Sequence, residues 1–175
     1  RKCLKMTIFK PNIIARDKVD STNELAKQHL LNGADEGLLI IAERQSEGRG
    51  RKDRRWYSPV GGLYFSLVLR PRLNTTNAPL MGILVSCAVA QSLRSIGVPK
   101  ASVKWPNDIL LGFDKVSGIL SELYSVSQDS HFVIIGVGVN QNSTKSDFPE
   151  EFVYSFTTVR DYLGHKTSQE TLLCH

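Results

Sequence analysis

The sequence predicts an α+β fold, in which a mixed or largely antiparallel sheet carries packed helices. Several apolar runs have the length of strands, two segments place apolar residues at helical spacing, and strands crowd together after residue 100. The order of these elements is not a regular alternation of strands and helices, so a doubly wound parallel sheet is not expected. A chain of 175 residues is long enough to bury the core of one domain.

The first half of the chain is expected to hold three strands, two helices and a long polar loop. Residues 12–19 have a strand pattern. Ser21 and Glu24 then have the spacing of a capping box, and Gly33 is a suitable end for the helix that they begin. Further patterns predict strands at 37–44 and 62–70 and a helix at 78–96.

The second half is expected to consist mostly of strands, with two short helices at its end. The strands are predicted at 101–105, 109–111, 116–124 and 131–139. A weak helical pattern covers 158–163, and a capping box that starts at Thr167 opens one more helix. Since the chain ends within that helix, we expect a single domain over residues 1–175 that is truncated at its C-terminus.

The composition argues against a disordered, fibrous or membrane-spanning chain. Hydrophobic residues make up 41% and charged residues 22%, which is typical of a globular domain. No apolar run approaches the roughly 18 residues of a membrane span, and no signal peptide is visible. The net charge of +5 favours an anionic partner, but residues 49–55 hold five bases and one acid and so carry +4 of it. The basic character therefore lies in one loop.

The three cysteines, Cys3, Cys87 and Cys174, are far apart and form no C-x-x-C pair. This spacing argues against a disulfide framework and against a zinc site. Cys87 lies in an apolar run and is expected to be a core thiol. Free thiols fit a reducing compartment best, so we expect the cytoplasm.

The long polar loop that follows the second strand is the first candidate for function, since loops of this length are uncommon unless functional or disordered. Its glycines, Gly48 and Gly50, let a ligand approach the backbone closely. Arg49 and Arg51 can each bind a phosphate or a carboxylate through two N–H donors. A solvated, flexible basic loop is an equally good interpretation of the same residues. The dinucleotide-binding pattern does not fit, because aspartate stands at its third glycine position.

Three shorter segments are also candidates, each with an ordinary structural alternative. Asn107 and Asp108 could bind Mg²⁺ or position a nucleotide, although Asn-Asp after proline is common in turns and that interpretation is favoured for the pair alone. Lys115 could neutralise charge that develops on a phosphate, with Gly118 leaving room beside it, or it could be a surface lysine. Residues 21–23 could bind a small polar group or merely cap the helix.

The order and spacing of these segments resemble the catalytic domain of biotin protein ligases, also called holocarboxylase synthetases. The matching stretches run in the order of that family from about residue 12 to residue 142. They are Asp20-Ser21-Thr22-Asn23, Ala42-Glu43-Arg44-Gln45 leading to Gly48-Arg49-Gly50-Arg51, Trp56-Tyr57-Ser58-Pro59, Val103-Lys104-Trp105-Pro106-Asn107-Asp108, Lys115-Val116-Ser117-Gly118-Ile119-Leu120 and Gly136-Val137-Gly138-Val139-Asn140. The G-R-G-R and K-W-P-N-D stretches are specific to this family, whereas the remote lipoate ligases share the fold with a different loop.

The resemblance implies a fold like that of class II aminoacyl-tRNA synthetases, and it implies a two-step reaction. Biotin and ATP would give biotinoyl-5′-AMP and pyrophosphate, with Mg²⁺ as cofactor. A lysine on the biotin carboxyl carrier domain of a biotin-dependent carboxylase would then take the biotin. Nucleic acid and membrane are not expected as partners, and a homodimer is left open. The alternatives are a biotin-binding module without turnover and, less favoured, an acyl transfer like that of lipoate ligases.

The resemblance also implies roles for individual residues. The ureido ring of biotin would be hydrogen-bonded by Ser21, Thr22 and Asn23, and the valeryl chain would lie near Gln45. Space for the rings would come from Gly118. The loop that closes over biotin would consist of Gly48, Arg49, Gly50 and Arg51. On the nucleotide side, Lys115 would contact the biotin carboxylate and the α-phosphate and act catalytically with Arg49 and Arg51. The remaining nucleotide-side residues would be Trp56, Lys104, Asn107, Asp108 and Asn140, with Asp108 binding the metal.

The chain also departs from the family pattern. Aspartate stands at position 53, where family loops commonly have glycine, and this is expected to affect loop closure. No helix-turn-helix pattern precedes residue 12 and no β-barrel pattern follows the catalytic domain, so the sequence gives no support for a repressor role.

Overall fold

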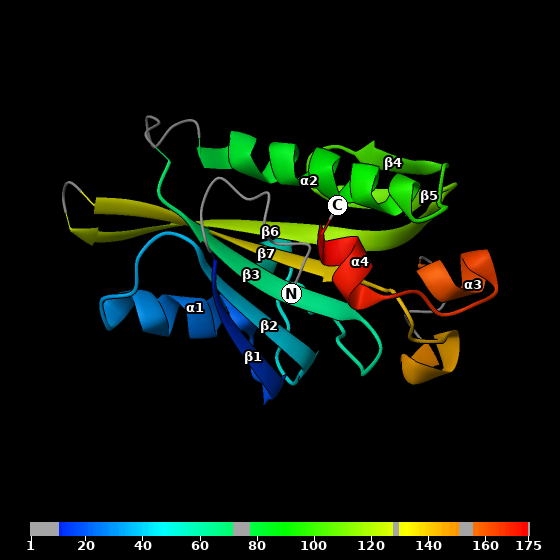
Figure 1. Ribbon diagram of the computed structural model, residues 1–175, viewed down its shortest axis with the longest axis horizontal. Coiled ribbons are helices and arrows are strands. Elements are labelled where there is room, and N and C mark those ends of the chain that lie inside the picture. Colours follow the sequence, from blue (N-terminus) through cyan, green and yellow to red (C-terminus); the bar gives the residue numbers. More distant parts are fainter. Residues whose placement is uncertain (1–10, 72–77, 128–129, 151–155, 175) are drawn as a thin grey trace.

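A computed structural model describes residues 11–71, 78–127, 130–150 and 156–174, and it confirms the predicted α+β class (Figure 1). Strands and helices follow one another in an irregular order along the chain. The elements are β1 (Asn12–Val19), α1 (Thr22–Leu31), β2 (Leu38–Gln45), the 3₁₀ turn η2 (Arg51–Asp53), β3 (Leu63–Leu69), α2 (Ala78–Ser95), β4 (Ala101–Lys104), β5 (Asp108–Leu111), β6 (Asp114–Ser127), β7 (Ser130–Val139), the 3₁₀ turn η4 (Lys145–Asp147), α3 (Val159–Leu163) and α4 (Gln169–Cys174).

The strands form one seven-stranded sheet in the order β1-β2-β3-β7-β6-β5-β4. Only the pair β1 and β2 runs parallel, and every other neighbouring pair is antiparallel. The sheet is therefore mixed and largely antiparallel, as predicted. The parallel pair follows from the helix α1, which carries the chain back across the sheet between the two strands, as a parallel connection requires.

The two longer helices cover opposite faces of the sheet, and alternate residues of β7 show this. Ile134 packs with Ala26 and Leu30 of α1, whereas Ile135 packs with Val89 and Leu93 of α2. Successive side chains of a strand point to opposite faces, so the two helices lie on different sides. Figure 1 shows the central strands between α1 and α2. Burial on both faces explains why β7 is apolar almost throughout.

All predicted strands and helices are present, but the predicted capping boxes are wrong in detail. Ser21 does occupy the N-cap position of α1, yet its side chain makes no capping hydrogen bond. Ser21 lines a cavity instead. Helix α4 begins after Ser168, whose hydroxyl accepts a hydrogen bond from Thr171 N–H (3.2 Å), one residue later than expected. Thr167 does not cap, because it bonds to Gln141.

Two of the cysteine predictions are also wrong. Cys87 is exposed, although its apolar neighbours suggested a core position. The run spans all sides of α2, and Leu84 is likewise 62% exposed, so the apolar pattern alone does not identify the buried side. Cys174 forms a disulfide. The expectation of free thiols, on which the reducing compartment was inferred, therefore fails at Cys174.

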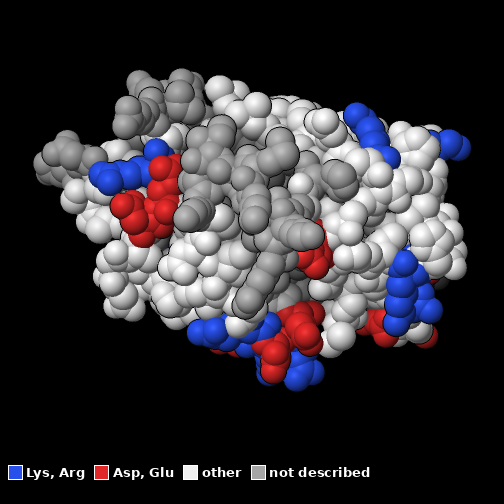
Figure 2. Space-filling model, in the orientation of Figure 1, with Lys and Arg blue, Asp and Glu red and all other residues white. Residues whose placement is uncertain are grey.

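Charged side chains do not form one continuous basic surface on the face seen in Figure 2. There, Lys and Arg lie in separate small groups, most of them beside Asp or Glu. Among the helices of the described residues, none is long and apolar enough to cross a membrane.

Candidate active site

A cavity of about 260 Å³ lies where the start of α1, the loop after β2 and the middle of β6 and β7 meet. It brings together every predicted site residue except Gly48, Lys104 and Asn140. Its lining consists of Ser21, Thr22, Asn23, Gln45, Arg49, Gly50, Arg51, Lys52, Arg54, Arg55, Trp56, Asn107, Asp108, Lys115, Gly118, Ile119, Leu120, Gly136, Val137 and Gly138. The mixture is strongly cationic on the loop side and neutral and polar at the start of α1.

The floor of the cavity is a glycine-rich part of the sheet. Gly118 of β6 pairs with Gly138 of β7, and Gly136 is the next residue on the same face. A Cβ at Gly138 would collide with the indole of Trp56, and one at Gly136 would collide with the amide of Asn23. Small residues are therefore required here so that these two side chains can lie directly on the sheet. The alternating G-V-G pattern carried this signal, although sequence reasoning assigned no site role to it.

A β-bulge places Lys115 on the cavity side of β6. Ile109 of β5 pairs with Ser117 while Leu110 pairs with Lys115, so β6 holds one extra residue at Val116. Val116 and Ser117 are both fully buried, and Val116 packs into the core beneath α2. The extra residue reverses the alternation, and Lys115 consequently shares a face with Gly118. A methyl group added at Gly118 would lie 3.1 Å from the Lys115 ammonium.

Two cations of the cavity, Lys115 and Arg51, are held by partners within the chain. Lys115 Nζ lies 2.7 Å from Asp108 Oδ1 and 5.1 Å from the centre of the Trp56 ring. Asp108 Oδ1 is buried and has no hydrogen bond of good geometry among the described residues, so its pairing with Lys115 is ionic. Arg51 donates a hydrogen bond to Asn107 Oδ1 at 3.1 Å. Of the predicted nucleotide-side residues, Lys115 thus contacts Asp108 and Trp56, and Asn107 contacts Arg51 of the loop.

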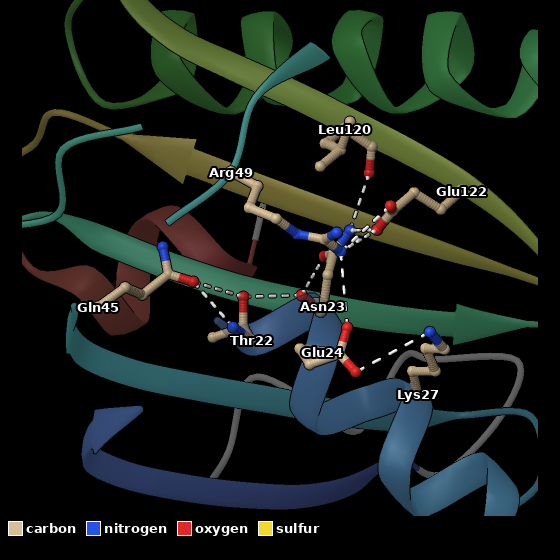
Figure 3. A network of polar contacts seen from close by, with 9 residues as sticks. Thr22, Asn23, Glu24, Lys27, Gln45, Arg49, Leu120 and Glu122 are labelled. Carbon is tan, nitrogen blue, oxygen red and sulfur yellow. Dashed lines mark hydrogen bonds and ion pairs between the residues drawn. The ribbon is translucent and has the colours of Figure 1, made fainter. Parts of the chain in front are cut away.

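The neutral polar end of the cavity is built by α1 and β2 (Figure 3). Thr22 N–H donates to Gln45 Oε1 at 2.8 Å, and the Thr22 hydroxyl lies 3.1 Å from the same oxygen. Gln45 Nε2 donates in turn to Ser58 Oγ at 2.8 Å. Thr22 is buried, and its hydroxyl is also 2.7 Å from that of Ser66 on β3. Ser66 lies beneath the cavity and was missed because an isolated serine in a strand carries no distinguishing pattern.

Glu122 of β6 is a second residue that sequence reasoning missed. Arg49 reaches across from the loop and donates to both Glu122 oxygens at 3.2 Å, with Glu24 of α1 at 3.8 Å (Figure 3). Asn23 Nδ2 donates to the same Glu122 carboxylate at 2.7 Å. Glu122 stands four residues after Gly118 on β6 and therefore lies on the same, cavity-facing side of the strand, and this spacing was the signal in the sequence.

The predicted polar loop folds back as an irregular hairpin. Trp56 N–H donates to Gly48 C=O at 2.8 Å, and Gly50 N–H donates to Arg54 C=O at 2.6 Å. A Cβ at Gly48 would collide with the Trp56 carbonyl, so this glycine serves the packing of the loop itself. At the tip, Asp53 has a left-handed backbone (φ 57°), the conformation that glycine adopts without cost. Aspartate at position 53 therefore strains the backbone of the loop, whereas glycine, the residue expected there from the family pattern, would not.

Lys104 and Asn140 lie outside the cavity. Lys104 ends the edge strand β4 and is exposed, with its backbone paired to that of Asp108. Asn140 is buried at the end of β7, and its Nδ2 donates to Thr157 C=O at 3.3 Å. Asn140 therefore joins the sheet to the segment before α3, and neither residue reaches the cavity.

Residues 15–140 match the model of the biotin/lipoate A/B protein ligase family. The chain is 35% identical to the bifunctional ligase/repressor BirA of Bacillus spizizenii over 173 residues, which are 98% of this chain and 53% of that protein. It is 36% identical over 125 residues to the biotin–[acetyl-CoA-carboxylase] ligase of Paracoccus denitrificans, covering 70% of this chain and 52% of that one. The chain thus spans about half the length of these relatives.

A solved structure agrees in fold. The biotin protein ligase of Aquifex aeolicus, in complex with biotin and ATP, superposes with a TM-score of 0.79 at 35% identity, over 94% of this chain and 66% of that one. The chain therefore belongs to the biotin/lipoate A/B protein ligase family, and within that family it is similar to the catalytic domain of the biotin protein ligases.

Proposed function

We propose that this domain activates biotin with ATP to give biotinoyl-5′-AMP and then transfers biotin to a lysine of a biotin carboxyl carrier domain. One observation carries the proposal: a single cavity holds a neutral hydrogen-bonding end at Thr22 and Gln45 and a cationic end at Lys115 and Arg51. Biotin has the same two ends, a neutral ureido ring and a carboxylate. The names of the similar proteins, which are biotin ligases, support the same substrate.

At the neutral end, the ureido ring would bind beside the first turn of α1. Ser21, Thr22 and Asn23 are all buried and line the cavity with short polar side chains. Gln45 lies against Thr22 and would border the valeryl chain as it runs toward the cations. In this structure the Trp56 indole and the Lys115 side chain lie over Gly118, so the rings would lie on Gly118 only after these side chains move.

At the cationic end, two anions must approach each other before a bond can form. The biotin carboxylate attacks the α-phosphorus of ATP, the bond from that phosphorus to the bridging oxygen breaks, and pyrophosphate leaves with its electron pair. Lys115, Arg49 and Arg51 would offset the charge on the reacting oxygens. In this structure they are bonded in turn to Asp108, Glu122 and Asn107, so they would exchange these partners for substrate oxygens. A carrier lysine amine then attacks the acyl carbon, and AMP leaves.

Mg²⁺ fits the nucleotide side. Asp108 Oδ1 is buried and forms an ion pair with Lys115, and Oδ1 of the neighbouring residue Asn107 accepts a hydrogen bond from Arg51, so oxygen donors of the kind that Mg²⁺ prefers are present. One carboxylate from the protein is enough when substrate phosphates complete the shell, and the described residues contain no cluster of three acidic, His or Cys side chains. Bound there, Mg²⁺ would neutralise phosphate charge.

Closure of the polar loop, which carries Arg49 and Arg51, would protect the mixed anhydride from water. No enzyme nucleophile is required, since the carboxylate and the carrier amine do the attacking.

We also propose that the reaction takes place in the cytoplasm, where ATP and carboxylases meet.

The test is incubation of the chain with biotin, Mg-ATP and an acceptor carrier domain. The proposal expects pyrophosphate release and biotin on the acceptor lysine. Binding of biotin without pyrophosphate release would instead indicate a binding module, and transfer of lipoate in preference to biotin would indicate the other branch of the family. Either result would overturn the proposal.

A further inference from the structure

The Glu122 carboxylate sets the orientation of a buried amide. Asn23 is 4% exposed, and one end of its side chain lies 2.7 Å from Glu122 Oε2 and 3.5 Å from Leu120 C=O. Both neighbours accept hydrogen bonds and donate none, because a carboxylate and a carbonyl carry no hydrogen. The amide nitrogen must therefore face Glu122, and the amide oxygen must face the other way.

This orientation fixes the hydroxyl hydrogens that follow. Asn23 Oδ1 lies 2.5 Å from Ser66 Oγ, which is fully buried, so Ser66 has to donate its one hydrogen there. Ser66 Oγ is also 2.7 Å from Thr22 Oγ1, and with its own hydrogen committed it can only accept from Thr22. The chain of hydrogen bonds thus runs in one direction, from Thr22 through Ser66 and Asn23 to Glu122. Thr22, Asn23 and Glu122 are labelled in Figure 3.

Two acceptor oxygens are left at the cavity. The hydroxyls of Thr22 and Ser66 carry two hydrogens for three contacts, at 2.5, 2.7 and 3.1 Å, and we assign the hydrogens to the two shorter ones. Thr22 Oγ1 then keeps only lone pairs on the side that faces Gln45 Oε1. Gln45 Oε1 is itself an acceptor, already bonded to Thr22 N–H at 2.8 Å. Both residues line the cavity. A pair of acceptors this close favours a ligand that brings an N–H group to them.

We propose that Glu122 is a positioning residue. Although Glu122 does not line the cavity, it orients the polar groups that do, so that the cavity selects a ligand that donates N–H groups. The inference rests on the proposed function, in which biotin supplies the ureido N–H groups. Glu122 also forms an ion pair with Arg49 of the polar loop at 3.2 Å. The same carboxylate therefore connects that loop to the residues that would bind the ureido ring.

The chain offers a matched control. Glu24 is also an ion-pair partner of Arg49, at 3.8 Å, and the two glutamates are similarly exposed, at 41% for Glu24 and 35% for Glu122. Of the two carboxylates, Glu122 is the one that accepts the hydrogen bond from the Asn23 amide. Glu122→Ala and Glu24→Ala therefore remove the same kind of charge beside Arg49, and only the first releases the amide.

The experiment measures the affinity of each variant, without ATP, for biotin and for biotin methylated on a ureido nitrogen. The parent is expected to prefer biotin by about tenfold or more, the cost of leaving buried acceptors unpaired. In Glu122→Ala the ratio of the two affinities should fall about tenfold, whereas Glu24→Ala should keep the ratio of the parent within about twofold. A loss of fold stability alone would lower both affinities together and leave the ratio unchanged.

An unchanged ratio in Glu122→Ala, or an equal fall in Glu24→Ala, would overturn the assignment of Glu122 while the parent still binds biotin. A parent chain that binds no biotin would overturn the proposed function itself, and the two failures are therefore distinct.

Discussion

Replacement of Lys115 by alanine should slow formation of the adenylate by on the order of 10²–10³, the cost of one lost transition-state donor. The structure supports this size. Lys115 Nζ already sits 2.7 Å from an anionic oxygen in the cavity. A unit charge at that distance interacts by about 6 kcal/mol at an effective dielectric constant of about 20. If about half a charge develops on the phosphoryl oxygen, about 3 kcal/mol of barrier lowering is lost, or roughly a hundredfold in rate.

The assay is pyrophosphate release from biotin and Mg-ATP in a single turnover, at saturating substrate. Lys115→Met keeps an unbranched side chain of similar length and should be as slow as the alanine variant, because the charge is what matters. Lys18→Ala is the matched control, since Lys18 is exposed on the edge strand β1 and does not line the cavity. Parent-like pyrophosphate release in Lys115→Ala would refute the reasoning.

Other changes test separate parts of the site. Arg51→Ala should release biotinoyl-5′-AMP about tenfold faster, because a charge-assisted contact is lost, and equal dissociation rates would contradict this. Gly138→Ala should lower the free energy of unfolding by about 1–3 kcal/mol in urea titrations, since the new methyl would strike the Trp56 indole, whereas Gly82→Ala meets only ordinary contacts and should not destabilise. Hydrogen bonds from a backbone N–H and a hydroxyl three residues earlier lower the pKa of Asp147. Asp147→Asn should therefore lower the free energy of unfolding by about 0.5 kcal/mol above pH 4, and this difference should fade as the pH falls through the lowered pKa. Equal stability of the parent and the variant at pH 7 would contradict the prediction.

Most of the fold could be predicted because periodicity reports directly on strands and helices. The β7 run was readable as a strand, since both of its faces are buried and nearly every residue is apolar. Capping could not be read in the same way. Ser21 has the residue type and spacing of a cap, but only the fold shows that its side chain lines the cavity and makes no capping bond.

The candidate site was predictable where short motifs carry it and unpredictable where packing does. Lys115 and the arginines stand in distinctive stretches, yet the bulge that turns Lys115 toward the cavity has no signature in the sequence. Glu122 was missed because an acidic residue alternating along a strand is common, and its partners Asn23 and Arg49 are far from it along the chain. Contacts between segments so distant in sequence depend on the register of the sheet, which local patterns do not encode.

The most direct test of the central claim is native mass spectrometry of the chain after incubation with biotin and Mg-ATP. We expect a complex of one chain with one biotinoyl-5′-AMP when the parent has completed one turnover. At the same incubation time Lys115→Ala, whose polar end still binds biotin alone, should carry almost no adenylate. A parent chain that carries biotin but no adenylate, or an adenylate yield equal in the two proteins, would contradict it.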